Sequence, residues 1–299
     1  MPIATSPLRY PGGKTALLET VAETMRLNKI DRGRYVEPYA GGGGLALSLL
    51  YAGHVTSIQL NDVDVAIAAL WRAMLDRPED LIEMMMAVPV TVEEWERQRL
   101  LYLAGPRTDE TELALATLFL NRTNRSGIIK TGGIIGGKKQ TGNYLIDCRF
   151  NKETISARIR RIAKYRNRIE FTSEDALDFI RKRREAPDHR SFMFIDPPYF
   201  KAGADLYTSF YRPEDHLDVA EAIGELDRPW MLTYDTAPEI MRMYRGNRQF
   251  RFDQLYSAQT KRMGVELMVV SKGLRLPASV RERQCHKPQY RTARVASSA

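Results

Sequence analysis

The fold is decided by residues 34–62, which have the sequence RYVEPYAGGGGLALSLLYAGHVTSIQLND. This stretch predicts a short strand over 34–38, a glycine turn at 41–44, an apolar helix over 45–52 and a β-branched strand over 54–60 that ends at Asn61 and Asp62. Strand, glycine turn, helix, strand and acid in this order are typical of the first βαβ unit of a nucleotide-binding sheet. We therefore expect an α/β protein with a ligand close to the glycine turn.

The glycine turn does not match the two common phosphate-binding loops. No Gly-Lys-Ser/Thr follows it, which excludes a Walker A loop, and Ala46 stands where a dinucleotide-binding loop has its third glycine. Asp62 lies about 20 residues beyond the glycines, the spacing at which an acid binds ribose hydroxyls. The alternative role for Asp62 is to cap the next helix.

The rest of the chain places an insert inside this α/β pattern. Helices are predicted over 15–30, 65–75, 78–86, 92–103 and 109–120. Residues 126–146 hold six glycines in short β-prone runs and predict a β-hairpin with a long tip, after which Asn151 caps a basic helix that ends near Tyr165. Strands and helices then alternate again: strand 169–172, helix 176–184, strand 191–195, helix 213–226, strand 230–234, and a hairpin of 250–256 with 266–271.

The positive charge of the chain is concentrated in two segments. The 299 residues carry a formal charge of +8, but residues 121–170 alone hold 13 Lys and Arg against three Asp and Glu. The segment from about Leu276 is also basic and has few large apolar residues, so we expect it to be disordered. A basic block on an otherwise acidic body favours a polyanionic partner, nucleic acid before membrane, although a solvated basic face is the alternative.

The motif Asp196-Pro197-Pro198-Tyr199 directly follows a strand with the pattern of a buried one. In α/β sheets, ligands bind at the carboxyl ends of such strands. The two prolines fix the backbone and remove two N–H donors, so the turn presents a carboxylate, free carbonyls and an aromatic ring. Asp196 and the Pro197 carbonyl can then accept two hydrogen bonds from one amino group, and Tyr199 can stack on a flat ring. On its own, the motif could also be a simple loop stop.

Other classes of protein are disfavoured by what the sequence does not contain. Cys148 and Cys285 are its two cysteines, and they form neither a CxxC pair nor a Cys/His cluster, so we expect no disulfide framework and no metal site. The N-terminus lacks the apolar run of a signal peptide, and no stretch approaches the roughly 20 apolar residues of a membrane helix. We therefore expect a cytoplasmic protein.

Four motifs occur in the order found in Dam-type adenine-N6 DNA methyltransferases, a family that this chain resembles over residues 6–272. They are Tyr-Pro-Gly-Gly-Lys at 10–14, Glu-Pro-Tyr-Ala-Gly-Gly-Gly at 37–43, Asn-Asp at 61–62 and Asp-Pro-Pro-Tyr at 196–199. The resemblance implies a Rossmann-like methyltransferase sheet that binds S-adenosylmethionine. It also implies a cofactor-binding and catalytic domain over 1–63 and 166–275, and an inserted target-recognition domain of helices and a hairpin over 64–165. The tail would be 276–299.

The resemblance also assigns roles to individual residues. Asp196, Pro197, Pro198 and Tyr199 match the catalytic turn. The positions that match the cofactor site are Tyr10, Lys14, Glu37 and Asp196, with Tyr39 and Gly41 beside the methionine portion, Asp62 at the ribose and Asp175 near the adenine.

The basic insert then becomes a candidate surface for double-stranded DNA. Arg and Asn side chains read guanine and adenine edges in the major groove, whereas Lys mostly contacts phosphate. The candidate DNA-binding residues are Arg122, Asn124, Arg125, Lys130, Lys138 and Lys139. We expect about half of all cations in this segment to be solvated surface charges.

The sequence predicts an enzyme that transfers a methyl group to N6 of adenine in a short DNA site, with the target base flipped out and with no covalent intermediate. We expect it to be a monomer in solution, to act on DNA in one or more copies, and to need neither metal nor membrane. The alternatives are a DNA-binding module with an inactive methyltransferase body and a methyltransferase for another amino group, such as cytosine N4 or RNA. The recognition sequence does not follow from one chain, and GATC is only a default.

Overall fold

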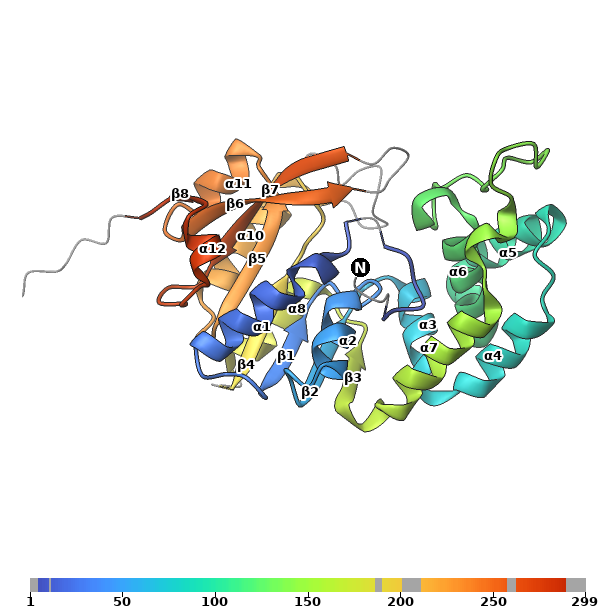
Figure 1. Ribbon diagram of the computed structural model, residues 1–299, viewed down its shortest axis with the longest axis horizontal. Coiled ribbons are helices and arrows are strands. Elements are labelled where there is room, and N and C mark those ends of the chain that lie inside the picture. The colour runs from blue at the N-terminus through green and yellow to red at the C-terminus, as the bar shows by residue number, and fades with distance from the viewer. Residues whose placement is uncertain (1–4, 11, 186–189, 201–210, 257–261, 289–299) are drawn as a thin grey trace, which may run out of the picture.

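The sheet of the computed structural model is mixed and has eight strands in the described residues, which are 5–10, 12–185, 190–200, 211–256 and 262–288 (Figure 1). The strand order is β3-β2-β1-β4-β5-β7-β6-β8. The first five strands in this order are parallel, and β7, β6 and β8 are antiparallel to their neighbours. The bounds are β1 Arg34–Glu37, β2 Ser57–Asn61, β3 Ile169–Thr172, β4 Ser191–Ile195, β5 Trp230–Asp235, β6 Arg248–Tyr256, β7 Arg262–Val270 and β8 Gln284–His286.

Helices cover both faces of this sheet and form a separate group beside it (Figure 1). A 3-10 turn, Lys14–Leu17, leads into α1, so the helix predicted over 15–30 is shorter than expected. The helices are α1 Leu18–Leu27, α2 Gly44–Tyr51, α3 Val65–Asp76, α4 Pro78–Ala87, α5 Val92–Ala104, α6 Glu110–Thr123, α7 Lys152–Lys164, α8 Ala176–Glu185, α10 Pro213–Gly224, α11 Pro238–Met243 and α12 Ala278–Arg281. The other predicted helices, and the predicted strands outside residues 126–146, are confirmed to within a few residues at their ends.

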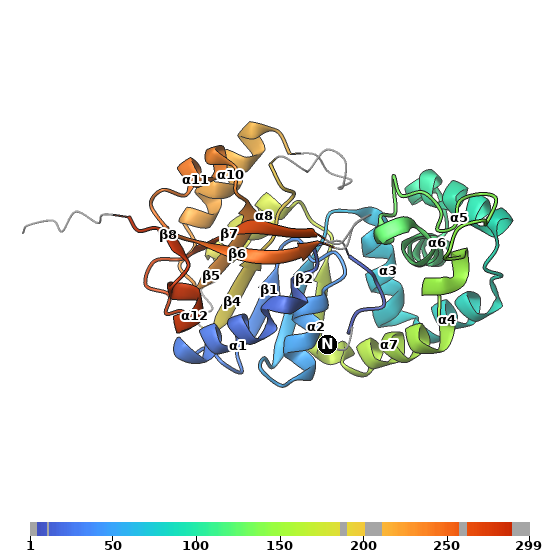
Figure 2. The same cartoon turned by 45° about the horizontal axis from the view of Figure 1, so that its top comes forward.

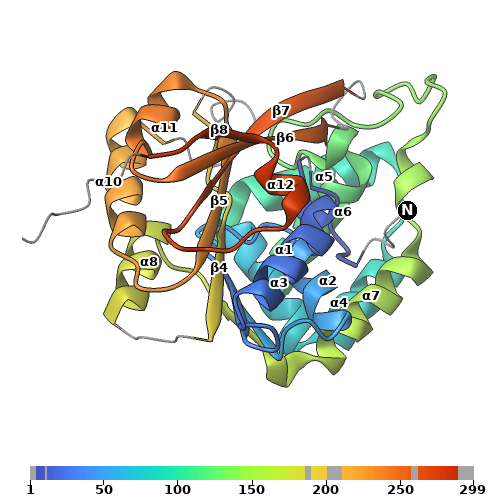
Figure 3. The ribbon, with the colours of Figure 1, turned by 60° about the vertical axis from the view of Figure 1, so that its left-hand side comes forward.

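Alternate residues of the central strands enter two different buried clusters. On β4, Phe192 and Phe194 pack on the side of α1 and α2, whereas Met193 and Ile195 pack on the side of α8, α10 and α11. Figure 3 shows these two groups of helices on opposite faces of the sheet. All five residues of β4 are buried, as expected for a parallel strand covered on both faces.

The strand order reverses between β1 and β4, which lie side by side at the centre of the sheet. The glycine turn follows β1, and the turn that begins at Asp196 follows β4. Because parallel strands end at the same edge, the fold brings these two segments together at the switch point, where open α/β sheets bind their ligands.

Helices α3 to α7 lie between β2 and β3 in the chain and form the helical insert beyond the β3 edge of the sheet (Figures 1 and 2). The insert has no core of its own. One buried cluster runs from Met25 of α1 and Tyr35 of β1 to Leu118 of α6 and Ile159 of α7. Trp71 of α3 joins the two parts, since its ring stacks on Phe171 of β3 with centroids 5.7 Å apart.

The predicted β-hairpin of residues 126–146 is wrong. This segment, part of the insert loop (residues 124–151), contains 3-10 turns and one isolated pairing, between Asn124 and Ile134. Hydrogen bonds from side-chain amides take the place of the backbone hydrogen bonds between two hairpin strands. Asn124 donates to the Ile128 and Ile129 carbonyls, and Gln140 donates to the Ile135 and Gly137 carbonyls. Several of the glycines adopt positive φ, so they serve loop geometry rather than a hairpin tip.

The prediction that the chain is disordered from about residue 276 is wrong for residues 276–288. Leu274 and Leu276 are both 3 % exposed and belong to the main buried cluster. The chain then forms α12 and adds β8 to the free edge of β6. Two buried leucines and an available strand edge therefore order a segment whose composition is mostly polar, and residues 289–299 lie outside the described residues.

Candidate active site

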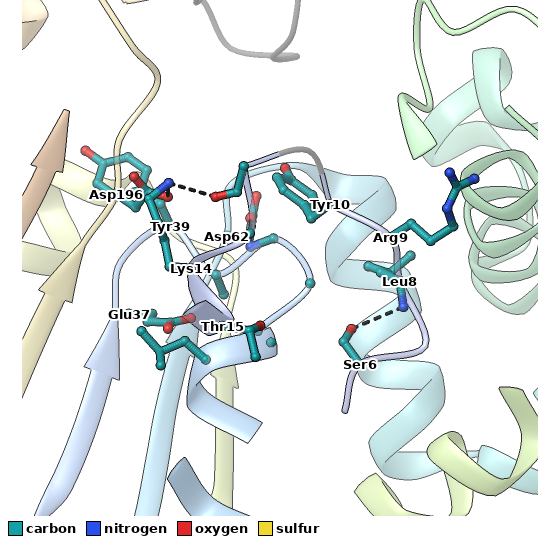
Figure 4. Close-up of a pocket in the computed structure, with 18 of the residues that line it drawn as sticks. Ser6, Leu8, Arg9, Tyr10, Lys14, Thr15, Glu37, Tyr39, Asp62 and Asp196 are labelled. Carbon is teal, nitrogen blue, oxygen red and sulfur yellow. Dashed lines mark hydrogen bonds and ion pairs between the residues drawn. The ribbon is translucent and has the colours of Figure 1, made fainter. Parts of the chain in front are cut away.

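A cavity of about 450 Å³ lies at the carboxyl ends of β1, β2 and β4 (Figure 4). One wall is the N-terminal strap, residues 5–10, together with the turn that leads to Lys14. The opposite walls are the glycine turn, Asp62 and the Asp196 turn, and the end beside the insert is lined by Arg122 and Arg158. The structure therefore brings together motifs that are up to about 190 residues apart in the sequence.

The glycine turn is held closely by its neighbours. Gly43 has a φ of +58°, and a Cβ there would lie 2.7 Å from the Trp71 ring. The Trp71 indole N–H donates to the Gly41 carbonyl at 2.8 Å, and the Tyr10 ring packs directly on Gly41. The turn needs glycine for conformation at Gly43 and for close approach at Gly41.

Asp62 faces the glycine turn and does not cap the next helix. Its Oδ2 accepts the Gly41 N–H at 2.7 Å and its Oδ1 accepts the Asp64 N–H at 3.0 Å. The side chain that caps α3 is that of Asp64, which accepts the N–H groups of Ala66 and Ile67. Burial raises the pKa of Asp62 to about 6.

Asn61 has a structural role that sequence reasoning missed. Its side chain is fully buried and donates to the Pro38 and Glu174 carbonyls, while its Oδ1 accepts from Thr172 Oγ1 and the Glu174 N–H. It therefore joins the ends of β1 and β3 to β2. The available signal was a polar residue at the end of an otherwise buried strand.

Asp196 lies at the centre of a network of charges. Lys14 Nζ is 2.8 Å from Asp196 Oδ2 and 3.6 Å from Glu266 Oε2, and Thr233 Oγ1 donates to Asp196 Oδ1 at 2.7 Å. Lys14 is buried, and so is Glu266 on β7. The contributions of Glu266 and Thr233 were not predicted, because nothing in the local sequence links these strands to the Asp196 turn.

The remaining residues of the turn are buried against the sheet. Pro197, Pro198 and Tyr199 are all buried, and the Tyr199 hydroxyl lies 3.4 Å from Asp196 Oδ1. The Tyr199 ring is in contact with Tyr234, at 6.1 Å between centroids, and Lys14 Nζ lies 5.3 Å from its centre. The turn is thus fixed by packing on one side and by Lys14 on the other.

Of the other residues predicted to bind the cofactor, Glu37 and Tyr39 line the same cavity and Asp175 does not. Glu37 is buried, accepts the Tyr35 hydroxyl at 2.8 Å, and has a pKa that burial raises to about 8. The Tyr39 and Tyr211 hydroxyls form a hydrogen bond of 3.0 Å at the rim. Asp175 is exposed, caps α8 through the Leu177 and Asp178 N–H groups, and is not among the lining residues.

The structure separates the predicted DNA-binding residues into two groups. Arg122 and Asn124 are buried, and Asn124 Oδ1 accepts the Trp95 indole N–H at 2.7 Å, so this amide is used inside the protein. Arg125, Lys130, Lys138 and Lys139 are exposed on the insert loop. Of these, Lys138 forms an ion pair with Glu96 at 2.8 Å.

The described residues contain neither a metal-binding cluster nor a membrane-spanning helix. No group of three or more His, Cys, Asp or Glu side chains within those residues is arranged to hold a metal ion. No helix in the described part of the chain has both the length and the apolarity needed to cross a membrane.

The strand order, the glycine turn after β1 and the acidic turn after β4 define a Rossmann-like α/β protein with a ligand site at the switch point of its sheet. The chain belongs to the D12 class N6 adenine-specific DNA methyltransferase family, whose model matches residues 10–265. It is thus an adenine-specific DNA methyltransferase that depends on S-adenosylmethionine.

Curated relatives agree with this assignment. The chain is 21 % identical over 238 residues to the Type II methyltransferase M.MjaIII of Methanocaldococcus jannaschii, a match that covers 74 % of this chain and 80 % of the relative. It is 25 % identical over 256 residues to the Type II methyltransferase M1.LlaDCHI of Lactococcus lactis subsp. cremoris, covering 79 % and 83 %. Among solved structures, a SAM-dependent methyltransferase from Agrobacterium tumefaciens matches with a TM-score of 0.36 and 11 % identity, covering 84 % of this chain and 60 % of that one.

The cavity has the chemistry that S-adenosylmethionine requires. The cofactor carries a positive sulfonium and ribose hydroxyls, and the acidic side chains Glu37, Asp62 and Asp196 line the cavity. The glycine turn leaves backbone rather than side chains along one wall. Asp62 would hold the ribose, and the Asp196 carboxylate would face the positive end. Burial raises the pKa of Glu37 to about 8, so Glu37 would contribute as a neutral polar group at neutral pH.

Proposed function

We propose that this enzyme methylates N6 of adenine within a short specific sequence of double-stranded DNA, after the target base has rotated out of the helix into the cavity. The observation that carries the proposal is the position of Asp196, which lines the cavity and whose two oxygens are oriented by Lys14 and Thr233. A base that stays stacked in a duplex cannot enter such a cavity, so it must be extruded, at a cost of a few kcal/mol.

Asp196 and the Pro197 carbonyl would act on the amino group of the flipped adenine. The N6 lone pair is delocalised into the ring, which makes it a weak nucleophile. Two hydrogen bonds donated by N6 to these acceptors favour a tetrahedral nitrogen and localise the lone pair. S-adenosylmethionine supplies an electrophilic methyl group when it is bound. The residues of the turn then contribute mainly through positioning, since Tyr199 and the two prolines are held rigidly.

The helical insert is the part that we propose reads the DNA. Arg125, Lys130 and Lys139 extend from the insert loop into solvent. Arg is suited to guanine edges and Lys to phosphate. The proposal takes the enzyme to act as a monomer in the cytoplasm, where its DNA substrate is found. Participation in a restriction system is one biological setting of the same reaction.

The decisive experiment replaces Asp196. Asp196→Ala removes the acceptor for N6 and is expected to lower methyl transfer at least about 100-fold, because positioned acceptors of this kind contribute that much. Glu266 still neutralises Lys14 in the variant, so fold and DNA affinity should persist. Incorporation of tritiated methyl groups measures activity, and circular dichroism and a DNA-binding titration serve as controls.

Full activity in Asp196→Ala would rule out the mechanism. If the wild-type chain binds DNA but incorporates no label, the inactive-body alternative is correct. Methylation-aware sequencing of DNA from a methylation-deficient host that expresses the chain identifies the modified base and its site. A modified cytosine would contradict the proposed substrate, and GATC serves as the first sequence to test.

A further inference from the structure

Four arginines gather where the N-terminal strap meets the insert. Arg9 belongs to the strap, Arg122 to the end of α6, Arg158 to α7, and Arg149 ends the 3-10 turn Ile146–Arg149. Arg122 is only 9 % exposed. Burial, together with the nearby charges of Arg9, Arg158 and Arg149, lowers the pKa of Arg122 to about 10. Burial and Arg149 likewise lower the pKa of Arg9.

The described hydrogen bonds of the Arg9, Arg122 and Arg158 side chains go to main-chain carbonyls. Arg122 donates to Arg149 O at 2.6 Å and to Pro7 O at 3.4 Å. Arg9 donates to Asn124 O at 3.3 Å, and Arg158 donates to Ser6 O at 3.2 Å. A guanidinium has five N–H donors, so each of these side chains keeps donors for a further acceptor.

These arginines lack the carboxylate partners that nearby cations have. Within the described residues, none of the four forms an ion pair with an Asp or Glu. By contrast, Arg160, which lies on α7 like Arg158, pairs with Glu79 at 2.8 Å. Arg166, just beyond the end of α7, pairs with Asp76 at 2.9 Å. Arg125, Lys130 and Lys139 also form no described ion pair, but they are exposed to solvent, whereas Arg122 is buried without a carboxylate partner.

A buried guanidinium surrounded by like charges is unfavourable unless an anion neutralises it. Arg9, Arg122 and Arg158 also line the cavity that contains Asp196, so an anion bound to them would enter the same space as the substrate. The cavity is therefore acidic near Asp62 and Asp196 and basic at its insert end. Figure 4 shows Arg9 directed toward the helices of the insert, away from Lys14 and Asp196.

We propose that Arg9, Arg122 and Arg158 form an oxyanion-binding subsite, whose occupant is a DNA phosphodiester beside the flipped adenosine. The inference rests on the proposed function, which brings DNA to this cavity. Arg is suited to such a ligand because its planar fork matches two phosphate oxygens. The methionine carboxylate of the cofactor has the same chemistry and is the second source that the experiment must distinguish.

The first arm measures DNA affinity as a function of salt. Arg158→Gln removes one cation and one bond to the strap, and loss of a phosphate contact should reduce the slope of log Kd against log salt by about 1. Arg160→Gln is the matched control, because it also removes one positive charge from α7, but from a side chain that is already paired with Glu79. The salt slope of this control should stay near that of the wild type. Arg158→Lys keeps the charge and should retain most of the slope.

The second arm locates the phosphate. Duplexes that carry one neutral methylphosphonate linkage at a time around the target adenine are bound to wild type and to Arg158→Gln. At one linkage, neutralisation should weaken DNA binding by the wild type about tenfold, because one charged hydrogen bond is lost. The same linkage should leave Arg158→Gln unaffected, because the partner is already absent.

The third arm tests the cofactor carboxylate. Calorimetry without DNA compares S-adenosylmethionine with its decarboxylated analogue. If Arg158→Gln weakens the binding of S-adenosylmethionine but not that of the decarboxylated analogue, the subsite is supported with the cofactor carboxylate as its occupant. If neither cofactor nor DNA binding changes in a variant whose thermal midpoint matches the wild type, the subsite is wrong. Label incorporation by the wild type, measured in parallel, tests the proposed function separately, so the two failures are distinguishable.

Discussion

Glu37 lies at the end of β1 and lines the cavity close to Lys14 and Asp196. Burial and the nearby Asp196 raise its pKa, whereas the Tyr35 hydroxyl and Lys14 lower it, and burial dominates to give a pKa of about 8. The side chain is therefore mostly protonated at neutral pH. This reduces the negative charge that the fold must keep out of water beneath the cofactor site.

The pKa of Glu37 predicts a specific dependence of stability on pH. The carboxyl group titrates near 4.5 in an unfolded chain and near 8 in the folded protein, so the folded state binds the extra proton between these values. Its contribution to stability is present below about pH 4.5 and is lost as the pH rises toward 8, by up to about 1.4 kcal/mol per pH unit. Glu37→Gln keeps an acceptor for Tyr35 and cannot ionise. Urea unfolding from pH 6 to pH 9 should show a smaller loss of stability in the variant, and parallel curves would contradict the assignment.

At the scale of single residues, the sequence predicted those residues whose role is indicated by their immediate neighbours in the chain. The Asp196 turn and Asp62 were found because they follow strands at a known spacing, and both line the cavity. Asn61, Thr233 and Glu266 were missed because their importance depends on partners on other strands. Asn124 was misleading, since an amide beside two arginines resembles a DNA-reading residue although Trp95 and the insert loop use it internally.

At the scale of elements, a buried amide links the N-terminal strap to the insert, in addition to the hydrogen bonds of Arg9, Arg122 and Arg158. Asn121, near the end of α6, accepts the Arg9 N–H at 2.7 Å and donates to the Arg9 and Gly127 carbonyls at 2.7 and 2.8 Å. Gly127 approaches so closely that a Cβ there would lie 2.5 Å from the Arg9 carbonyl oxygen. One side chain therefore positions both a wall of the cofactor cavity and the start of the insert loop.

Asn121→Ala should impair cofactor and DNA binding together. It leaves two half-buried main-chain groups of Arg9 and the buried Gly127 carbonyl without their partner, which costs about 3 kcal/mol of stability. Because the strap carries Tyr10 and the loop carries Arg125, both KM for S-adenosylmethionine and Kd for DNA should rise at a temperature where the variant is folded. Thr91→Ala is the control, since loss of the α5 cap costs about 1 kcal/mol but touches neither segment. An unchanged KM in Asn121→Ala would show that the joint is purely structural.

The insert loop also shows where pattern reading fails for elements. Glycines between short apolar runs fit a hairpin tip and a loop with positive φ equally well. What decides between them is a pair of side-chain amides, buried Asn124 and half-buried Gln140, which bind the carbonyls that a ladder would use. Helices α3 to α7 were predictable because each has a clear apolar period and a polar or proline start.

At the scale of the whole molecule, the C-terminal segment belongs to the folded body as far as β8. A chain that ends at residue 288 should keep the wild-type thermal midpoint and methylated site, and should lose some DNA affinity at low salt, because Arg291 and Arg294 are removed. A chain that ends at residue 275 loses the buried Leu276 and exposes the edge of β6. We expect a lower midpoint and a greater tendency to aggregate, measured by differential scanning calorimetry and light scattering. Equal midpoints for the two truncations would show that α12 and β8 contribute nothing.

The distribution of charge was predicted in outline but not in detail. The positive excess of residues 121–170 does lie on the insert, beside the cavity. Three members of this excess, Lys138, Arg160 and Arg166, are paired with acids of the same insert. Pairing depends on which helices are adjacent, and composition alone does not contain this information.

The single buried cluster that runs from α1 to α7 limits how the specificity of this enzyme can be altered. An insert with its own core could be exchanged between relatives as a module, whereas here a transplanted set of helices would have to match the Trp71–Phe171 stack and the surface of the sheet. The insert loop lies outside that constraint over much of its length, since many of its side chains are exposed. Under the proposed role of this loop in reading DNA, new sequence preferences are accessible through substitution and length change there, and directed evolution of this enzyme should begin with it.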